Sequence, residues 1–115
     1  MKKIIIVFLL LGSSLWAREY SSYEAKQHIG ESATVCGKIV SGHYSSSSRG
    51  QPTFLNMDGA YPNQVFTVVI WGESRHMFNS PESQYKNQSV CVSGDIESYK
   101  GVPQITVSRV SQIKR

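Results

Sequence analysis

Short segments in which apolar and polar residues alternate follow one another along most of this chain, and they limit the folds open to it. A period of two places successive side chains on opposite faces of a strand, so each segment predicts a strand with one buried face. The strongest segment, residues 65–71 (VFTVVIW), is made almost entirely of β-branched and aromatic residues. The chain is therefore expected to be mainly β.

Five such strands are predicted, and turn-forming residues separate them. A capping-box spacing, Ser21 to Glu24, predicts one short helix over about residues 22–28, which Gly30 can close. A polar Ser/Gly-rich loop is expected at 41–52, a short helix or turn at 72–87 and a hairpin loop at 99–103. The predicted strands are residues 32–40, 53–58, 65–71, 89–98 and 104–108.

This layout matches a five-stranded Greek-key barrel of the OB type, with a short N-terminal helix and a short helix or turn between the third and fourth strands. In that topology the first and fourth strands are neighbours. The chain length of 115 residues allows a single domain of this kind.

The N-terminus has the three parts of a secretory signal peptide. Lys2 and Lys3 precede an apolar run at residues 4–11, and small residues lead to Ala17. The run is too short to span a bilayer, which takes about 20 apolar residues. We expect a signal peptide at residues 1–17 and an OB-fold domain at 18–115, periplasmic or secreted and without stable membrane insertion after cleavage. The alternative is an uncleaved N-terminal anchor.

Export bears on the charge and on the cysteines. Without Lys2 and Lys3, 10 basic residues stand against 8 acidic ones, a net charge of +2, which attracts polyanions only weakly.

Cys36 and Cys91 lie on the outward faces of strands expected to be adjacent, so the simplest interpretation is one disulfide in an oxidising compartment. The alternative, a redox-active pair or reactive thiol, is disfavoured because there is no C-x-x-C spacing.

The segments ATVCGKIV, PTFLNMDGAYPNQVFTVVIW and VCVSGDIESYKGVPQI, with the closing SQI, resemble the small exported OB-fold nucleic-acid-binding domains of bacteria. Similar domains are fused to secreted nucleases. The resemblance implies an OB barrel that binds nucleic acid. The FLNMD stretch also resembles the second strand of anticodon-binding OB domains, in which an outward Phe at the position of Phe54 stacks on a base.

Periodicity supports this assignment of faces. If Leu55 and Met57 point inward, Phe54 and Asn56 point outward. OB domains bind single strands across the second and third strands, with aromatic residues stacking on bases and basic residues following the phosphates. The candidate stacking residues are Phe54, Trp71, Tyr44 and Tyr99. The candidate phosphate contacts are Arg49, Lys38 and Lys100, and the other outward residues of the face are Asn56 and Thr67. The alternative is that Phe54 and Trp71 only cover the barrel ends.

Neither a catalytic motif nor a metal motif is recognisable in the sequence. His28, His43 and His76 are scattered and are expected to be surface residues. Staphylococcal-type nucleases also use an OB barrel, but they add catalytic Arg, Asp and Glu residues and a longer helical C-terminal part. We therefore expect no enzymatic activity, no cofactor and no metal.

Two functions remain open at this stage. The first is an exported, non-enzymatic module that binds single-stranded DNA or RNA, and a variant of it is an accessory to a secreted nuclease. The second is a periplasmic protein- or glycan-interaction module of the envelope-stress type that uses the same barrel face. The net charge of +2 favours the second, and the aromatic and basic loop residues favour the first.

Overall fold

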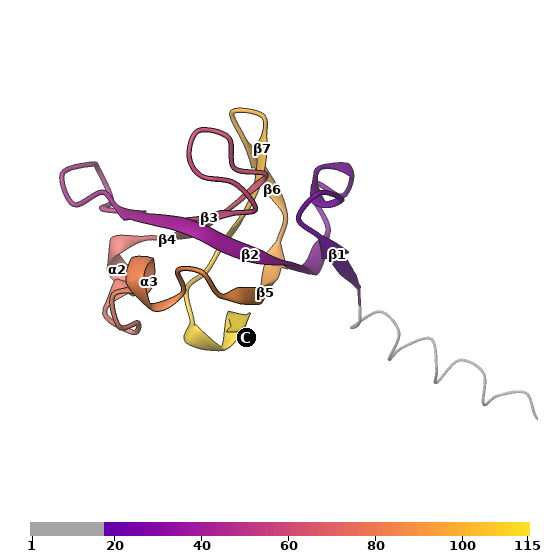
Figure 1. Ribbon diagram of the computed structural model, residues 1–115. Helices are drawn as coiled ribbons and strands as arrows, with labels where there is room; N and C mark the ends of the chain where they lie inside the picture. The colour runs from indigo at the N-terminus through magenta and orange to yellow at the C-terminus, as the bar shows by residue number, and fades with distance from the viewer. Residues whose placement is uncertain (1–17) are drawn as a thin grey trace, which may run out of the picture.

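The structure is a computed structural model that describes residues 18–115. The predicted signal peptide at residues 1–17 lies outside the described residues. The described part is mainly β, as predicted, with few and short helices (Figure 1). The strands are β1 (Glu19–Ser21), β2 (Ser32–Tyr44), β3 (Thr53–Met57), β4 (Phe66–Ile70), β5 (Ser89–Asp95), β6 (Glu97–Tyr99), β7 (Val102–Thr106) and β8 (Ile113–Lys114).

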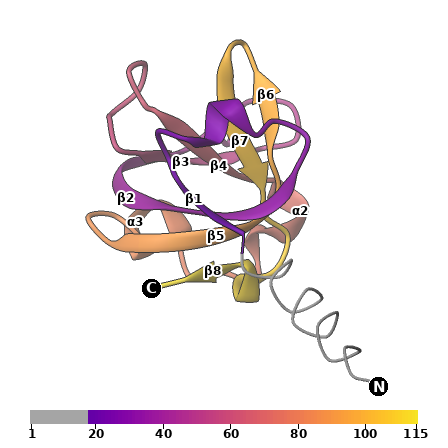
Figure 2. The ribbon, with the colours of Figure 1, turned by 90° about the vertical axis from the view of Figure 1, so that its right-hand side faces the viewer.

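The strands form one curled, barrel-like sheet in the order β6-β7-β4-β3-β2-β5-β8, and β1 pairs with β2 (Figures 1 and 2). The predicted neighbours, the first and fourth long strands, are β2 and β5, and they do pair antiparallel. The short helices lie between strands, with α3 packed against β2 and β3. They are η1 (Ala25–Gln27), α2 (Gly72–Arg75), α3 (Pro81–Gln84) and η2 (Val110–Gln112).

The predicted count of five strands is wrong, because the described residues form eight. Two of the extra strands, β1 and β8, are short segments that pair with the edges of β2 and β5. The third arises where the predicted strand 89–98 changes partners at Ile96. The Ile96 N–H donates to the Glu31 carbonyl, and its carbonyl accepts from Gly30. The chain therefore leaves β2 at Asp95 and pairs with β7 from Glu97 onward, which curls the sheet.

The predicted helix at 22–28 is also longer than the observed one. The capping box forms, since the Ser21 N–H donates to Glu24 Oε1 and the Glu24 N–H donates to Ser21 Oγ. Only η1, a single 3-10 turn, follows it. Gly30 has the expected positive φ of +96°, but its N–H bonds to Ile96 instead of closing the helix. The sheet therefore determines the path of the chain after η1.

The predicted loop at 41–52 begins later than expected, because Ser41–Tyr44 extend β2 along β3. Gly42, taken as a loop signal, sits beneath α3. A Cβ at this position would lie 2.8 Å from the backbone of Glu82. Gly42 thus lies where the backbones of β2 and α3 approach closely. Composition alone does not distinguish this use of glycine from its use in a turn.

The core lies inside the curl of the sheet. Val35, Ile39, Leu55 and Met57 are fully buried there, and for Leu55 and Met57 this agrees with the faces that alternation assigned. Where one short helix or turn was predicted at 72–87, the structure has two short helices, α2 and α3, and Tyr85, which follows α3, packs into the same core. Phe54, which directly precedes the core residue Leu55 in β3, is not part of this cluster and faces the other side of the sheet.

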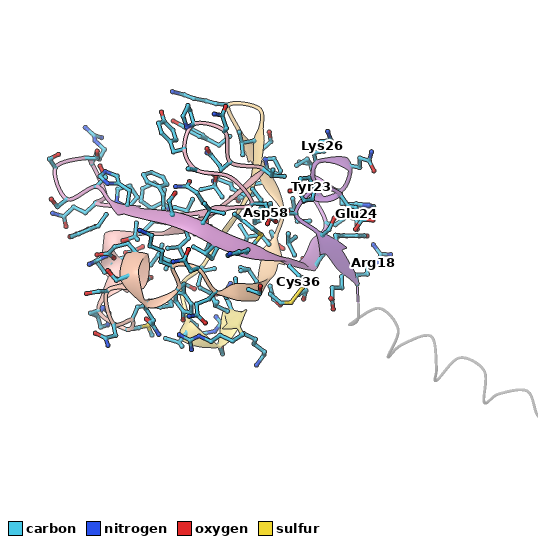
Figure 3. The ribbon with its side chains drawn as sticks, in the orientation of Figure 1. Arg18, Tyr23, Glu24, Lys26, Cys36 and Asp58 are labelled. Carbon is cyan, nitrogen blue, oxygen red and sulfur yellow. A yellow bond between two sulfur atoms is a disulfide. The ribbon has the colours of Figure 1, made fainter. Side chains whose placement is uncertain are left out.

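The predicted disulfide is confirmed. Cys36 on β2 and Cys91 on β5 are directly opposite each other in the register, with Cα atoms 4.0 Å apart, and their sulfurs are bonded. Figure 3 shows Cys36 on β2, next to the N-terminal segment. Such bonds persist in oxidising compartments. Among the described residues no helix has both the length and the apolar character needed to cross a membrane.

Candidate ligand-binding cavity

A cavity of about 570 Å³ opens on the outer face of the sheet, over β3, β4 and β7. Two projecting segments form its walls. One is the loop at 58–65 between β3 and β4, and the other is the hairpin turn between β6 and β7. Both project from the same end of the sheet (Figures 1 and 2). The cavity volume is within the range usual for small-ligand sites.

A row of polar side chains crosses the floor of the cavity. Asn56 on β3 is paired with Thr67 on β4, and Thr67 is paired with Gln104 on β7. Asn56 and Thr67 point away from the core, as predicted, but they are only 3% and 6% exposed. Phe54 lies beside this row and is half-buried. The floor therefore combines an aromatic ring with uncharged hydrogen-bonding groups.

Aromatic residues on the two walls are much more exposed than the floor. Tyr61, on the β3–β4 loop, is 77% exposed, and Tyr99, at the end of β6, is 59% exposed. Exposed tyrosines at a cavity mouth present flat rings to an incoming planar group, which is how single-strand-binding surfaces hold bases. The cavity is lined by His43, Phe54, Asn56, Tyr61, Pro62, Gln64, Thr67, Tyr99, Lys100, Val102 and Gln104.

One polar atom at the cavity lacks a hydrogen-bond partner. Gln64 donates from Nε2 to Thr67 Oγ1 at 3.2 Å, but its Oε1 is buried and accepts no hydrogen bond from the described residues. Asn56, by contrast, donates from Nδ2 to Ser41 Oγ at 3.0 Å. A buried acceptor without a partner costs about 1–3 kcal/mol. A ligand group that donates a hydrogen bond to Gln64 Oε1 would therefore remove this cost.

The positive charge of the cavity is concentrated at its rim. Lys100 is the only lysine or arginine among the described residues that line it. Lys100 and Gly101 form the hairpin turn with φ values of +51° and +84°, the signs that a type I′ turn requires. The Lys100 Nζ lies 5.4 Å from the centroid of the Tyr99 ring. The turn thus presents an aromatic ring and a cation together.

Tyr44, a predicted stacking residue, lies on the other face of the sheet. The register of β2 against β3 shifts between Ile39 and Ser41, which places Tyr44 opposite Thr53 and His43 opposite Phe54. The guanidinium of Arg75 covers the Tyr44 ring at 3.6 Å. The proposed stacking face of Tyr44 is therefore already occupied from within the protein.

The cover over Tyr44 is a fully connected network. Arg75 donates to both carboxylate oxygens of Glu82, at 2.8 and 3.0 Å, and to Thr53 Oγ1 at 2.8 Å. The hydrogen bonds to Glu82 raise the pKa of Arg75, and Arg75 lowers the pKa of Glu82. Because these groups satisfy one another, we interpret the network as structural: it joins α2 to α3.

The remaining predicted residues also lie away from the cavity. Trp71 is 40% exposed and packs on Gly50, whose Cβ, if present, would lie 3.0 Å from the ring. It lines a separate hollow of about 440 Å³ at the β2–β3 loop, where Arg49 is exposed. Lys38 is exposed on the part of β2 that pairs with β5. The structure thus brings together Phe54, Asn56, Thr67, Tyr99 and Lys100, and separates them from Tyr44, Trp71, Arg49 and Lys38.

Sequence reasoning missed several lining residues. Strand alternation alone could have predicted Gln104: if Ile105 and Val107 point inward, Gln104 points outward. Tyr61, Pro62 and Gln64 carried no periodic signal, because they belong to a loop. The sequence predicted binding residues both in the 41–52 loop, Tyr44 and Arg49, and in the hairpin, Tyr99 and Lys100. The structure instead sets the hairpin beside the 58–65 loop.

A second polar cluster ties the N-terminal segment to the sheet. Tyr20 OH and Arg18 Nη1 donate to Glu31 Oε1 at 2.7 and 3.0 Å, and His28 Nδ1 lies 2.7 Å from Glu31 Oε2. These hydrogen bonds, that of Tyr20 foremost, lower the pKa of Glu31 to about 2. Figure 3 shows Arg18 and the following turn with Glu24 packed beside β2.

One group of potential metal ligands is found among the described residues, and it does not suit a metal. Glu19 lies near Cys36 and Cys91. The two sulfurs are joined in the disulfide, so neither is a thiolate that could bind an ion.

Comparisons of this chain with the models of known protein families and with curated proteins find no match. The resemblance to exported OB-fold domains therefore stays a prediction.

Proposed function

We propose that this chain is an exported, non-enzymatic OB-type module that binds single-stranded nucleic acid in the cavity over β3, β4 and β7. The single observation that carries the proposal is the convergence, in one cavity, of Phe54 on the floor with the exposed Tyr61 and Tyr99 on its walls. Lys100, which lines the mouth of the cavity, would contact a phosphate of the strand.

The chemistry of single strands fits these residues. An unpaired base has two apolar faces, and stacking on an aromatic side chain contributes about 1–3 kcal/mol per base. A duplex hides those faces. The preferred ligand is therefore a single strand of DNA or RNA whose bases enter the cavity while the backbone passes its rim. A secreted nuclease that supplies such strands is the partner this function would suit.

One observation favours a second candidate, an oligosaccharide. Lys100 is the sole lysine or arginine among the described lining residues, whereas several lining side chains carry an amide or a hydroxyl group. Aromatic rings with amides and hydroxyls also suit uncharged sugars, and OB barrels bind both classes of ligand. In this case the module would act in the periplasm on glycan or on a protein of the envelope.

A titration by fluorescence anisotropy separates these functions. The protein, recovered from the periplasm of an expressing bacterium, is mixed with labelled single-stranded DNA, single-stranded RNA, duplex DNA and a cell-wall oligosaccharide at two salt concentrations. We expect the single strands to bind more tightly than the duplex, with affinity that falls as salt rises. Salt-independent binding of the oligosaccharide alone would replace the proposal by the second candidate.

A further inference from the structure

The lining of the cavity bears on which ligand it prefers, and the inference that follows rests on the proposed function. The floor and the loop wall present the amides of Asn56, Gln64 and Gln104 and the hydroxyl of Thr67. Surfaces that bind single strands without preference follow the backbone with cations and stack on bases. Uncharged amides at the bottom of a cavity instead suit hydrogen bonds to the edge of a base.

The direction of the existing hydrogen bonds shows what is missing. Asn56 and Gln64 each direct an amide N–H at a hydroxyl of the sheet, Ser41 Oγ and Thr67 Oγ1 respectively. On Gln64 this leaves Oε1, which is buried and has no partner among the described residues. The unmet requirement at this wall is therefore for a hydrogen-bond donor, not for an acceptor.

We propose that the cavity is selective for adenine or cytosine, and that Gln64 Oε1 accepts a hydrogen bond from the amino group at C6 of adenine or C4 of cytosine. Guanine, thymine and uracil carry a carbonyl oxygen at the corresponding position of the ring. A carbonyl oxygen directed at Oε1 gives no hydrogen bond and places two acceptors together. Phe54 holds the face of the base, and Gln64 selects its edge.

Cytosine and uracil make the sharpest comparison, because both are single rings of nearly equal area that differ at this position. Labelled decamers of deoxycytidine and deoxyuridine are titrated against the periplasmic protein at one salt concentration. We expect the deoxycytidine decamer to bind about tenfold more tightly, the effect typical of leaving one buried acceptor unpaired. Gln64→Met, which keeps length and removes the acceptor, should bring the two decamers to equal affinity.

Gln27→Met is the matched control, since Gln27 is an exposed glutamine on η1 and does not line the cavity. This variant should keep the full preference. A second measurement avoids variants altogether: the side-chain amide resonances of Gln64 in the unmodified protein should shift with the deoxycytidine decamer and stay in place with the deoxyuridine decamer.

The outcomes separate the two proposals. Equal affinity for both decamers would overturn the base preference and leave the proposed function standing. A preference that survives in Gln64→Met would overturn the role of Gln64. Binding of neither decamer, under conditions in which the protein melts cooperatively, would overturn both the preference and the proposed function.

Discussion

At the scale of single residues, neighbours in β3 have opposite roles. Leu55 is fully buried in the core, whereas Phe54 is half-buried on the floor of the cavity. The two side chains point to opposite faces because successive residues of a strand alternate. A matched pair of truncations therefore separates binding from stability within a single dipeptide.

Phe54→Ala should weaken binding of a single-stranded oligonucleotide by about 1–3 kcal/mol, the contribution of one stacked base. Its effect on the free energy of unfolding should be smaller than that of Leu55→Ala, which should lose about 2–5 kcal/mol. Anisotropy titrations and denaturant melts of both variants measure the two quantities. Full binding by a stable Phe54→Ala protein would remove Phe54 from the site.

The carboxylate of Glu31 predicts a dependence of stability on pH. Its pKa in the folded protein is lowered from 4.5 to about 2, so its contribution to stability is present above pH 4.5 and is lost as the pH falls toward 2. Glu31→Gln should therefore flatten the fall in stability across this window. Melts at a series of pH values test this, with Glu97→Gln, an exposed residue of β6, as the control. An unchanged acid limb in Glu31→Gln would contradict the assignment.

At the scale of elements, the projecting segments shape the cavity more than the strands do. The β6–β7 hairpin holds Tyr99 and Lys100 over the floor, and its turn needs two residues with positive φ. Asn-Gly is the most favourable pair for such a turn. The turn therefore allows the charge of Lys100 to be removed without loss of the hairpin.

Lys100→Asn should keep the melting temperature of the protein and reduce the salt dependence of single-strand binding. The slope of log K against log salt should become shallower by about 0.7, the value for one phosphate contact on a single strand. Lys26→Asn, a change at an exposed lysine of η1, should leave the slope as it was. If Lys100→Asn binds with the original slope, the backbone of the ligand does not pass this turn.

At the scale of the whole molecule, β2 and β5 are the pair that the disulfide holds together. Cys36 and Cys91 are 55 residues apart in the chain and opposite each other in the sheet. A domain of this size buries only a modest core, so constraining the unfolded chain matters for its stability. On the loop-entropy model, a bridge across such a span contributes up to about 4 kcal/mol.

Replacing both cysteines by alanine should lower the free energy of unfolding by up to about 4 kcal/mol. Dithiothreitol should destabilise the natural protein and leave the double variant unaffected. Denaturant melts with and without the reductant make the comparison. Alkylation of the unreduced, unfolded natural protein should add no label, and two labels per chain would show that the bond does not form.

What the sequence by itself determined is everything that depends on local periodicity. Alternation placed Leu55 and Met57 in the core and Phe54 outside it, and placed Cys36 and Cys91 on the outward faces of their strands. These inferences held because the pleat of a strand is a property of adjacent residues.

Only the tertiary structure decided where the outward residues go. A shift in register near Val40 turned Tyr44 to the other face, where Arg75 covers it. Packing also set the 58–65 loop beside the hairpin, which brought Tyr61 and Gln64 to the cavity and left Trp71 at the far end of β4. Such outcomes depend on contacts between residues far apart in the chain, and no local pattern encodes them.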